Sequence, residues 1–281
     1  MAYSKLEWTT STAITPERLN EREDIINRMN SVISDDSFIN GAGFHNSVYR
    51  GKDLGTSVTD NQYAAILNGT FEDLFIGDYW TINNVVYRIA AFDYYLGCGD
   101  VDLTTHHAVI VPDKKLYNAQ MHNTDSGGYE NGSANTTVGG YVGSDMYTTN
   151  LEQAKNTIKN AFSGHVLKHR LYLINMVSSN GYSSAGTWCD SEVDLMCEQM
   201  VYGSSCFAPI GNGSFTPANY KVEKSQLPLF RYRHDLIAIR DNYWLRDVLS
   251  GAYFAYVYYH GYAGCRDASY SFGVRPVFCI S

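Results

Sequence analysis

Several kinds of sequence signal are scarce in this chain of 281 residues. No apolar run reaches the length of a membrane span or a secretory signal, so we expect a chain made in the cytoplasm without membrane insertion. Basic residues number 21 against 29 acidic ones, for a formal net charge of −8, and no basic stripe suited to phosphate backbones is visible. We therefore expect no nucleic-acid partner.

Signals for metals and cofactors are scarce as well. Six cysteines lie scattered without a CxxC or Cys/His ligand spacing, which argues against a zinc site and favours reduced thiols. The neighbours His106 and His107 would face opposite sides of a strand and could not easily chelate one ion together. Val111-Pro112-Asp113 resembles a calcium loop of sugar-binding lectins, but the further oxygen ligands that calcium needs are missing around it. We expect neither a metal nor a cofactor.

Motifs of common enzyme classes are also missing. The chain has no Gly-x-Ser-x-Gly elbow, no phosphate-binding glycine loop and no dinucleotide-binding fingerprint. Cys189 and Cys206 lie in Gly/Ser-rich surroundings and histidines occur elsewhere, so a cysteine nucleophile stays open as an alternative. The leading expectation is a protein that is not an enzyme.

A helix is predicted near the start of the chain. Residues 15–17 combine a capping hydroxyl, a proline at the first turn and an acid near the positive end of the helix dipole. Apolar residues then recur at helical spacing over about 18 residues, at Leu19, Ile26, Met29 and Ile33. This stripe suits packing on the same subunit or against copies of itself, and the pattern does not choose between them.

The rest of the chain alternates short apolar runs with turn residues, which predicts an α+β fold with an irregular antiparallel sheet. The expected elements are a loop over 34–62, two strands within 78–92 joined at Asn83-Asn84, a strand over 106–111 stopped by Pro112, a loop over 122–144, helices over 150–162 and 191–201, and a last strand over 274–280.

Tyrosine is the residue that this chain has in excess, with 23 copies, and many lie between Tyr253 and Phe272. Tyrosine mixed with Gly, Ser, His and Asp is the composition of antibody-type binding surfaces. Alternate positions in this stretch share one face of a strand. The predicted outward face has Tyr256, Tyr258, His260, Tyr262, Gly264 and Arg266, and the predicted supporting face has Val257, Tyr259, Gly261, Ala263 and Cys265. An ordinary Tyr-rich strand would give the same pattern.

Three segments near the C-terminal end resemble the variable proteins of diversity-generating retroelements. They are Tyr243-Trp-Leu-Arg246, the tyrosine-rich run after it, and Gly273-Val-Arg-Pro276 before the last apolar strand. The chain looks in particular like tail receptor-binding proteins of gut bacteriophages. This resemblance implies a C-type lectin-like fold with two main helices over residues 61–281, a variable region at about 243–273, and an N-terminal helical attachment or oligomerisation segment over 1–60.

In that family, a reverse transcriptase diversifies asparagine codons into almost any residue except Lys, Glu, Gln, Met and Trp. Residues 250–272 contain none of these five. The resemblance implies an invariant scaffold of Trp244, Arg246, Arg275 and Pro276, with Trp244 in the core. The diversified, ligand-binding residues that it implies are Tyr256, Tyr258, His260, Tyr262, Gly264, Arg266, Asp267, Tyr270 and Phe272.

The function that follows from this resemblance is that of an adhesin on the phage tail, located in the virion. Its expected partners are a bacterial surface protein or glycan and other tail proteins, and we expect a homotrimer. A lectin-like enzyme with Cys/His chemistry is the alternative. The calcium ligands of a sugar-binding lectin and the cysteine context of formylglycine-generating enzymes are both missing.

Overall fold

The computed structural model describes residues 15–33, 40–122, 139–177, 183–206, 225–249 and 253–281. The fold is mixed α+β, with mainly antiparallel sheets and few helices, which confirms the expected class. The helices are α1 Pro16–Ile33, α3 Ala42–His45, α4 Asp60–Leu67, α5 Leu151–Ala161, α6 Glu198–Tyr202 and α7 Pro228–Tyr232, with a π-helical turn at Met146–Asn150 and a 3₁₀ turn at His234–Leu236.

Three sheets organise the described strands. One has the order β1-β2-β3-β12-β7, a second the order β10-β9-β8-β11-β4, and β5 and β6 form a separate hairpin. The strands are β1 Tyr79–Ile82, β2 Val85–Phe92, β3 Ala108–Pro112, β4 Tyr117–Gln120, β5 His169–Val177, β6 Ser183–Ser191, β7 Val193–Leu195, β8 Tyr243–Val248, β9 Tyr253–Val257, β10 Ala263–Asp267, β11 Ser271–Val274 and β12 Pro276–Ile280.

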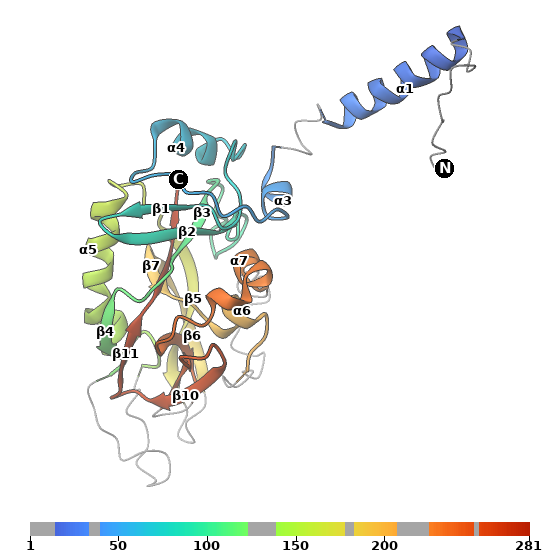
Figure 1. The fold of residues 1–281 in the computed structure, drawn as a ribbon. Coiled ribbons are helices and arrows are strands. Elements are labelled where there is room, and N and C mark those ends of the chain that lie inside the picture. The colour runs from blue at the N-terminus through green and yellow to red at the C-terminus, as the bar shows by residue number, and fades with distance from the viewer. Residues whose placement is uncertain (1–14, 34–39, 123–138, 178–182, 207–224, 250–252) are drawn as a thin grey trace.

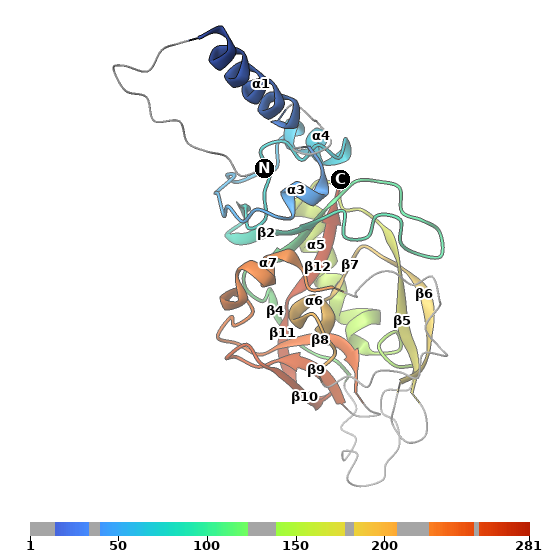
Figure 2. The same cartoon turned by 90° about the vertical axis from the view of Figure 1, so that its right-hand side faces the viewer.

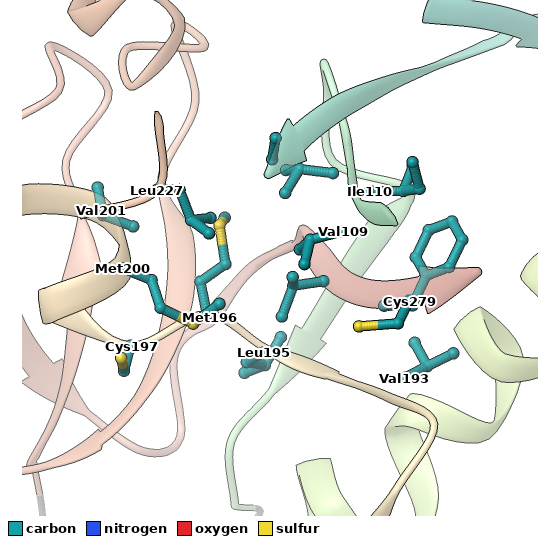
Figure 3. Packing of buried hydrophobic residues seen from close by; sticks show 14 of the residues in the cluster. Val109, Ile110, Val193, Leu195, Met196, Cys197, Met200, Val201, Leu227 and Cys279 are labelled. Carbon is teal, nitrogen blue, oxygen red and sulfur yellow. The ribbon is translucent and has the colours of Figure 1, made fainter. Parts of the chain in front are cut away.

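The centre of the first sheet lies in the core. All five residues of β3 and all five of β12 are buried, as expected for strands that are covered on both faces. Figure 3 shows Val109 and Ile110 of β3 close to Cys279 of β12, with Leu195 of β7 below them and Met200 of α6 on the adjoining side. The apolar run at 106–111 therefore does become a central strand, which begins at Ala108.

The predicted turn at Asn83-Asn84 is confirmed. β1 and β2 pair antiparallel up to Ile82 opposite Val85, and Asn83 and Asn84 both have positive φ, at 50° and 64°. Two residues with positive φ form the turn type that matches the twist of a two-residue hairpin, and asparagine tolerates this conformation better than most residues.

The predicted N-terminal helix is also confirmed, as the 18-residue α1. Leu19, Ile26 and Met29 on its apolar stripe are each more than half exposed. In Figures 1 and 2, α1 lies beyond the end of the body that carries α3 and α4, and the strand β10 lies at the opposite end. None of the helices in the described ranges is both long and apolar enough to cross a membrane.

The expected loop over 34–62 is wrong in part. Residues 40–59 pack along the first sheet through bridges of Tyr49 with Ile76 and Asp53 with Tyr79, and they contain α3. α4 starts at Asp60 because Thr59 and Gln62 form a capping box, in which each side chain accepts a hydrogen bond from the other residue's backbone N–H.

The helix expected over 191–201 is wrong in its first half. Val193–Leu195 forms β7, which pairs with β12 at the edge of the first sheet, and only Glu198–Tyr202 is helical. Burial on both sides of a short apolar segment overrides its helical spacing here. The helix expected over 150–162 is confirmed as α5, and most of the loop expected over 122–144 lies outside the described residues.

The last strand expected over 274–280 is divided between two sheets at Arg275. β11 ends one residue before Arg275 in the second sheet, and β12 begins one residue after it in the first sheet. Arg275 is fully buried, and its guanidinium donates hydrogen bonds to Pro112 O (2.8 Å), Leu236 O (3.0 Å) and the Tyr243 hydroxyl (3.2 Å). The side chain thus ties the end of β3 in one sheet to β8 in the other.

Replacing Arg275 should therefore destabilise the whole body. We expect Arg275→Ala to lower the free energy of unfolding by at least about 3 kcal/mol, because it leaves a cavity and unpaired carbonyl groups. Chemical denaturation with circular dichroism measures this loss. The exposed Arg231 on α7 is the matched control, and Arg231→Ala should change stability by no more than about 0.5 kcal/mol. Equal losses in the two variants would contradict a joining role for Arg275.

Candidate binding surface

The part of the tyrosine-rich stretch from Tyr253 to Asp267 folds into two strands and a turn instead of one long strand. β9 ends at Val257, residues 258–262 form the turn, and β10 runs back from Ala263. Tyr258 N donates to Tyr262 O (2.9 Å), Gly261 N donates to Tyr258 O (2.7 Å), and Gly261 has a φ of 94°. Glycine suits this turn because side-chain-bearing residues rarely adopt such a φ.

The pairing register keeps part of the predicted alternation across this turn. Tyr256 lies opposite Gly264, and every pair between β9 and β10 joins two even or two odd residue numbers. Tyr256, Gly264 and Arg266 therefore share one face of the sheet although the chain reverses between them. β8 continues the same face, because Trp244 lies opposite Tyr256.

The prediction for Tyr259 is wrong. We expected it on the supporting face with Val257, but it is 39% exposed, while Val257 is fully buried. The strand rule does not apply to Tyr259, because this residue lies in the turn. Its ring instead contacts the rings of Tyr258 (centroids 4.2 Å apart) and His260 (3.8 Å), so it adds to the exposed aromatic cluster.

Trp244 forms the floor of this cluster. It is fully buried, and its indole N–H donates to Ala119 O (3.0 Å). Phe272 and Tyr256 cover it with ring centroids at 4.8 and 6.2 Å, and they contact each other at 4.9 Å. Aromatic pairs at these distances add to the stabilisation from area burial, so the floor is well packed.

The outer part of the cluster continues from Tyr256. Tyr258 lies 6.3 Å from Tyr256 and stacks on Tyr262 at 4.8 Å, and His260 lies 5.9 Å from Tyr258. Tyr262 is 57% exposed. We use the term aromatic surface for Tyr256, Tyr258, Tyr259, His260, Tyr262, Arg266, Tyr270 and Phe272.

Arg266 and Tyr270 form the other end of the aromatic surface. The Arg266 guanidinium lies 4.5 Å from the Tyr270 ring centroid and donates to the Tyr270 hydroxyl (2.9 Å). Tyr270 in turn contacts Phe272 at 5.7 Å. A cation over an aromatic face is attracted to it, so this contact holds both long side chains in place.

The nine residues implied by the resemblance all reach the surface. His260, Tyr262, Arg266 and Tyr270 are exposed, and the other five are partly exposed. Asp267 lies apart from the ring contacts, opposite Tyr253 at the far end of the β9–β10 pair. Tyr259 is the residue that strand alternation missed, and Gly261 is the sequence signal for a turn that could have revealed it.

Two phenols of the aromatic surface have raised pKa values, so both are uncharged near neutral pH. A hydrogen bond with Tyr259 raises the pKa of Tyr258 to about 12, and burial raises the pKa of Tyr256. The aromatic surface thus combines rings and hydroxyl groups with the Arg266 guanidinium at one edge. Such an array can bury apolar area and form hydrogen bonds in the same contact.

The cysteines give little support to the enzyme alternative. Burial raises the pKa of Cys189, Cys206 and Cys265, and it raises the pKa of Cys197 to about 11. A nucleophilic cysteine needs the opposite shift, because the thiolate is the reactive form. Among the described residues, no group of three or more His, Cys, Asp or Glu side chains is arranged to hold a metal.

A hollow elsewhere on the body also lacks the features of an active site. It has a volume of about 170 Å³ and is lined in part by Tyr147, Lys155, Lys168 and Asp190. Typical small-molecule sites are larger, at about 300–1,000 Å³. Lys155 and Lys168 are already paired, with Glu152 at 2.7 Å and Asp190 at 2.5 Å.

Searches with the chain find no matching family model, no similar curated protein and no similar solved structure.

Two acidic residues, Asp247 on β8 and Glu198 on α6, interact with each other. Asp247 on β8 accepts a hydrogen bond from the backbone N–H of Glu198 (2.7 Å), and Glu198 accepts one from Cys206 N (2.8 Å). Burial, with a contribution from the charge of Glu198, raises the pKa of Asp247 to about 7. The folded state therefore binds a proton that the unfolded chain releases near pH 4.

This pKa shift predicts a pH-dependent stability. As the pH rises from about 4 to 7, the unfolded state loses the Asp247 proton first, so stability falls over this range and levels off above it. Asp247→Asn keeps an oxygen that can accept from Glu198 N but cannot ionise, so this decline should shrink. Thermal melts of both proteins between pH 4 and 8 measure the difference. Parallel curves would show that Asp247 has an ordinary pKa.

Proposed function

We propose that this protein is a receptor-binding adhesin of a bacteriophage tail, with a C-type lectin-like body and a diversified surface, of the type encoded with diversity-generating retroelements. The observation that carries the proposal is the aromatic surface. Its rings come from β9, from the turn at 258–262, and from Tyr270 and Phe272 just before and within β11, and they lie over the buried Trp244.

The arrangement of the body supports this role. Chain segment 40–59 joins the body at the end with α3 and α4, and the aromatic surface lies on β9–β10 near the other end (Figures 1 and 2). A protein held through its N-terminal segment would present the aromatic surface outward. The buried positions of Trp244, Arg246, Arg275 and Pro276 agree with a constant scaffold beneath exposed residues that vary.

The chemistry of the aromatic surface favours binding over catalysis. Tyrosine and arginine dominate the energetics of protein-recognition sites, and the rings lose little conformational entropy on binding because neighbouring rings already restrain them. The alternative of a lectin-like enzyme has no comparable observation in its favour, since the cysteines that reach the surface, Cys189, Cys206 and Cys265, have raised pKa values.

Binding to bacterial cells tests the proposal directly. We expect the fluorescently labelled full chain to stain one or more strains in a panel of gut bacteria, measured by flow cytometry. Tyr258→Ala combined with Tyr262→Ala should weaken the staining at least about tenfold, because two central contacts are lost. The same change should cost less than about 1.5 kcal/mol of stability, since one stacked pair on the surface is removed.

Tyr232 provides the matched control. It lies on α7 outside the aromatic surface and is 41% exposed, as is Tyr270. Tyr232→Ala should leave staining unchanged. Equal loss of staining with Tyr232→Ala, or unfolding of the Tyr258/Tyr262 variant, would contradict the proposal. An alignment of sibling genes supplies an independent check, because the proposal requires variation to concentrate at the nine positions.

The N-terminal helix has the role of assembly in this proposal. Leu19 and Ile26 are one heptad apart on α1, and both are more than half exposed. If α1 forms a trimer, Leu19→Glu with Ile26→Glu should convert it to monomers of 31.5 kDa, as measured by light scattering. Arg28→Glu places the same side chain on the opposite face and should keep the trimer. A monomeric unmodified chain would overturn this role of α1.

A further inference from the structure

The ring of Tyr256 lies directly over Gly264 on the neighbouring strand. A Cβ atom at position 264 would come within 2.7 Å of Tyr256 Cε1, 2.9 Å of Cζ and 3.1 Å of the hydroxyl oxygen. The first two distances are below any normal carbon–carbon contact. No side chain larger than hydrogen therefore fits at 264 while the Tyr256 ring keeps its present position.

The backbone does not explain the glycine. Gly264 lies inside β10, paired with Tyr256, and its φ is outside the left-handed region that favours glycine. Glycine weakens the interior of a strand and often marks a close approach of another group. Here the approaching group is the Tyr256 ring.

The position of that ring matters because Tyr256 joins the two levels of the aromatic surface. Tyr256 covers Trp244 together with Phe272 on one side, and on the other it contacts Tyr258, which stacks on Tyr262. A displaced Tyr256 ring would uncover part of Trp244 and remove the support beneath Tyr258. The geometry of the exposed tyrosines thus depends on the missing side chain at 264.

We propose that Gly264 is a positioning residue and that positions 256 and 264 form one size-coupled unit. Gly264 acts through the ring of Tyr256 and makes no side-chain contact with a ligand. A larger residue at 264 requires a smaller one at 256, so the two positions specify the shape of the aromatic surface together. The consequence for ligand specificity rests on the proposed adhesin function, whereas the coupling itself does not.

A double-mutant cycle tests the coupling without any receptor. Gly264→Ala should lower the Tm by about 2–4 °C in the unmodified chain, because the new Cβ displaces the ring. In the Tyr256→Ala background the same change meets no ring and removes a strand glycine, so the Tm should rise or stay constant. In the Tyr256→Phe background the loss should persist, since phenylalanine keeps both clashing carbon atoms.

Gly43 is the control for the general effect of replacing glycine. A Cβ at position 43 meets no atom within 4 Å, so Gly43→Ala should not lower the Tm. The same Tm change for Gly264→Ala in the unmodified chain and in the Tyr256→Ala background would overturn the proposal. If Gly264→Ala on its own leaves the chain unfolded, a folded double variant Tyr256→Ala/Gly264→Ala supports the proposal, and an unfolded double variant overturns it.

Cell staining then tests the positioning role. Gly264→Ala should reduce staining of a recognised gut strain at least about tenfold, and a crystal structure of this variant should show the Tyr256 ring moved from its place over residue 264. Unchanged staining with a displaced ring would overturn the positioning role and leave the adhesin proposal intact. Failure of the unmodified chain to stain any strain would count against the adhesin function, but the stability cycle would still decide the coupling.

Discussion

The buried guanidinium of Arg275 is the constraint on which the two large sheets depend. It sits at the one residue between β11 and β12 and hydrogen-bonds to neutral oxygens of Pro112, Leu236 and Tyr243, over the rings of Tyr243 and Phe230. A charge taken out of water is costly unless it is well satisfied, so its surroundings must keep their geometry. β8, which carries Trp244, is held in this way, and the aromatic surface rests on that strand.

Some elements of the fold could be predicted from local sequence patterns. The Asn83-Asn84 turn follows from the tolerance of asparagine for positive φ, and α1 follows from its capping residues and apolar spacing. Other parts depend on partners distant in the sequence. The segment at Val193–Leu195 becomes a strand because β12 offers an unpaired edge, and nothing within the segment encodes that edge. The capping box at Thr59 was readable from the sequence and shows that a polar stretch can still start a helix.

The aromatic surface was likewise predictable only in part. Alternation predicted that Tyr256, Gly264 and Arg266 share a face, and it succeeded because the hairpin register preserves the parity of residue numbers. It failed for Tyr259, since residues in a turn obey no two-residue period. The contact of the Tyr256 ring with Gly264 could not be read from the sequence either, because it depends on cross-strand register and on a side-chain rotamer.

In the proposed adhesin, a surface that accepts many different side chains needs a support that does not rely on them. Backbone hydrogen bonds of the β9–β10 pair and the Trp244 indole bond to Ala119 O are independent of the exposed side chains. Tyr256 and Phe272 are different, because they cover Trp244 as well as facing outward. Substitution at these two positions therefore changes both the exposed surface and the packing around Trp244, whereas Tyr262 and His260 in the turn can change with little structural cost. Fewer kinds of side chain should therefore be compatible with folding at the sheet positions 256 and 272 than at the turn positions 260 and 262.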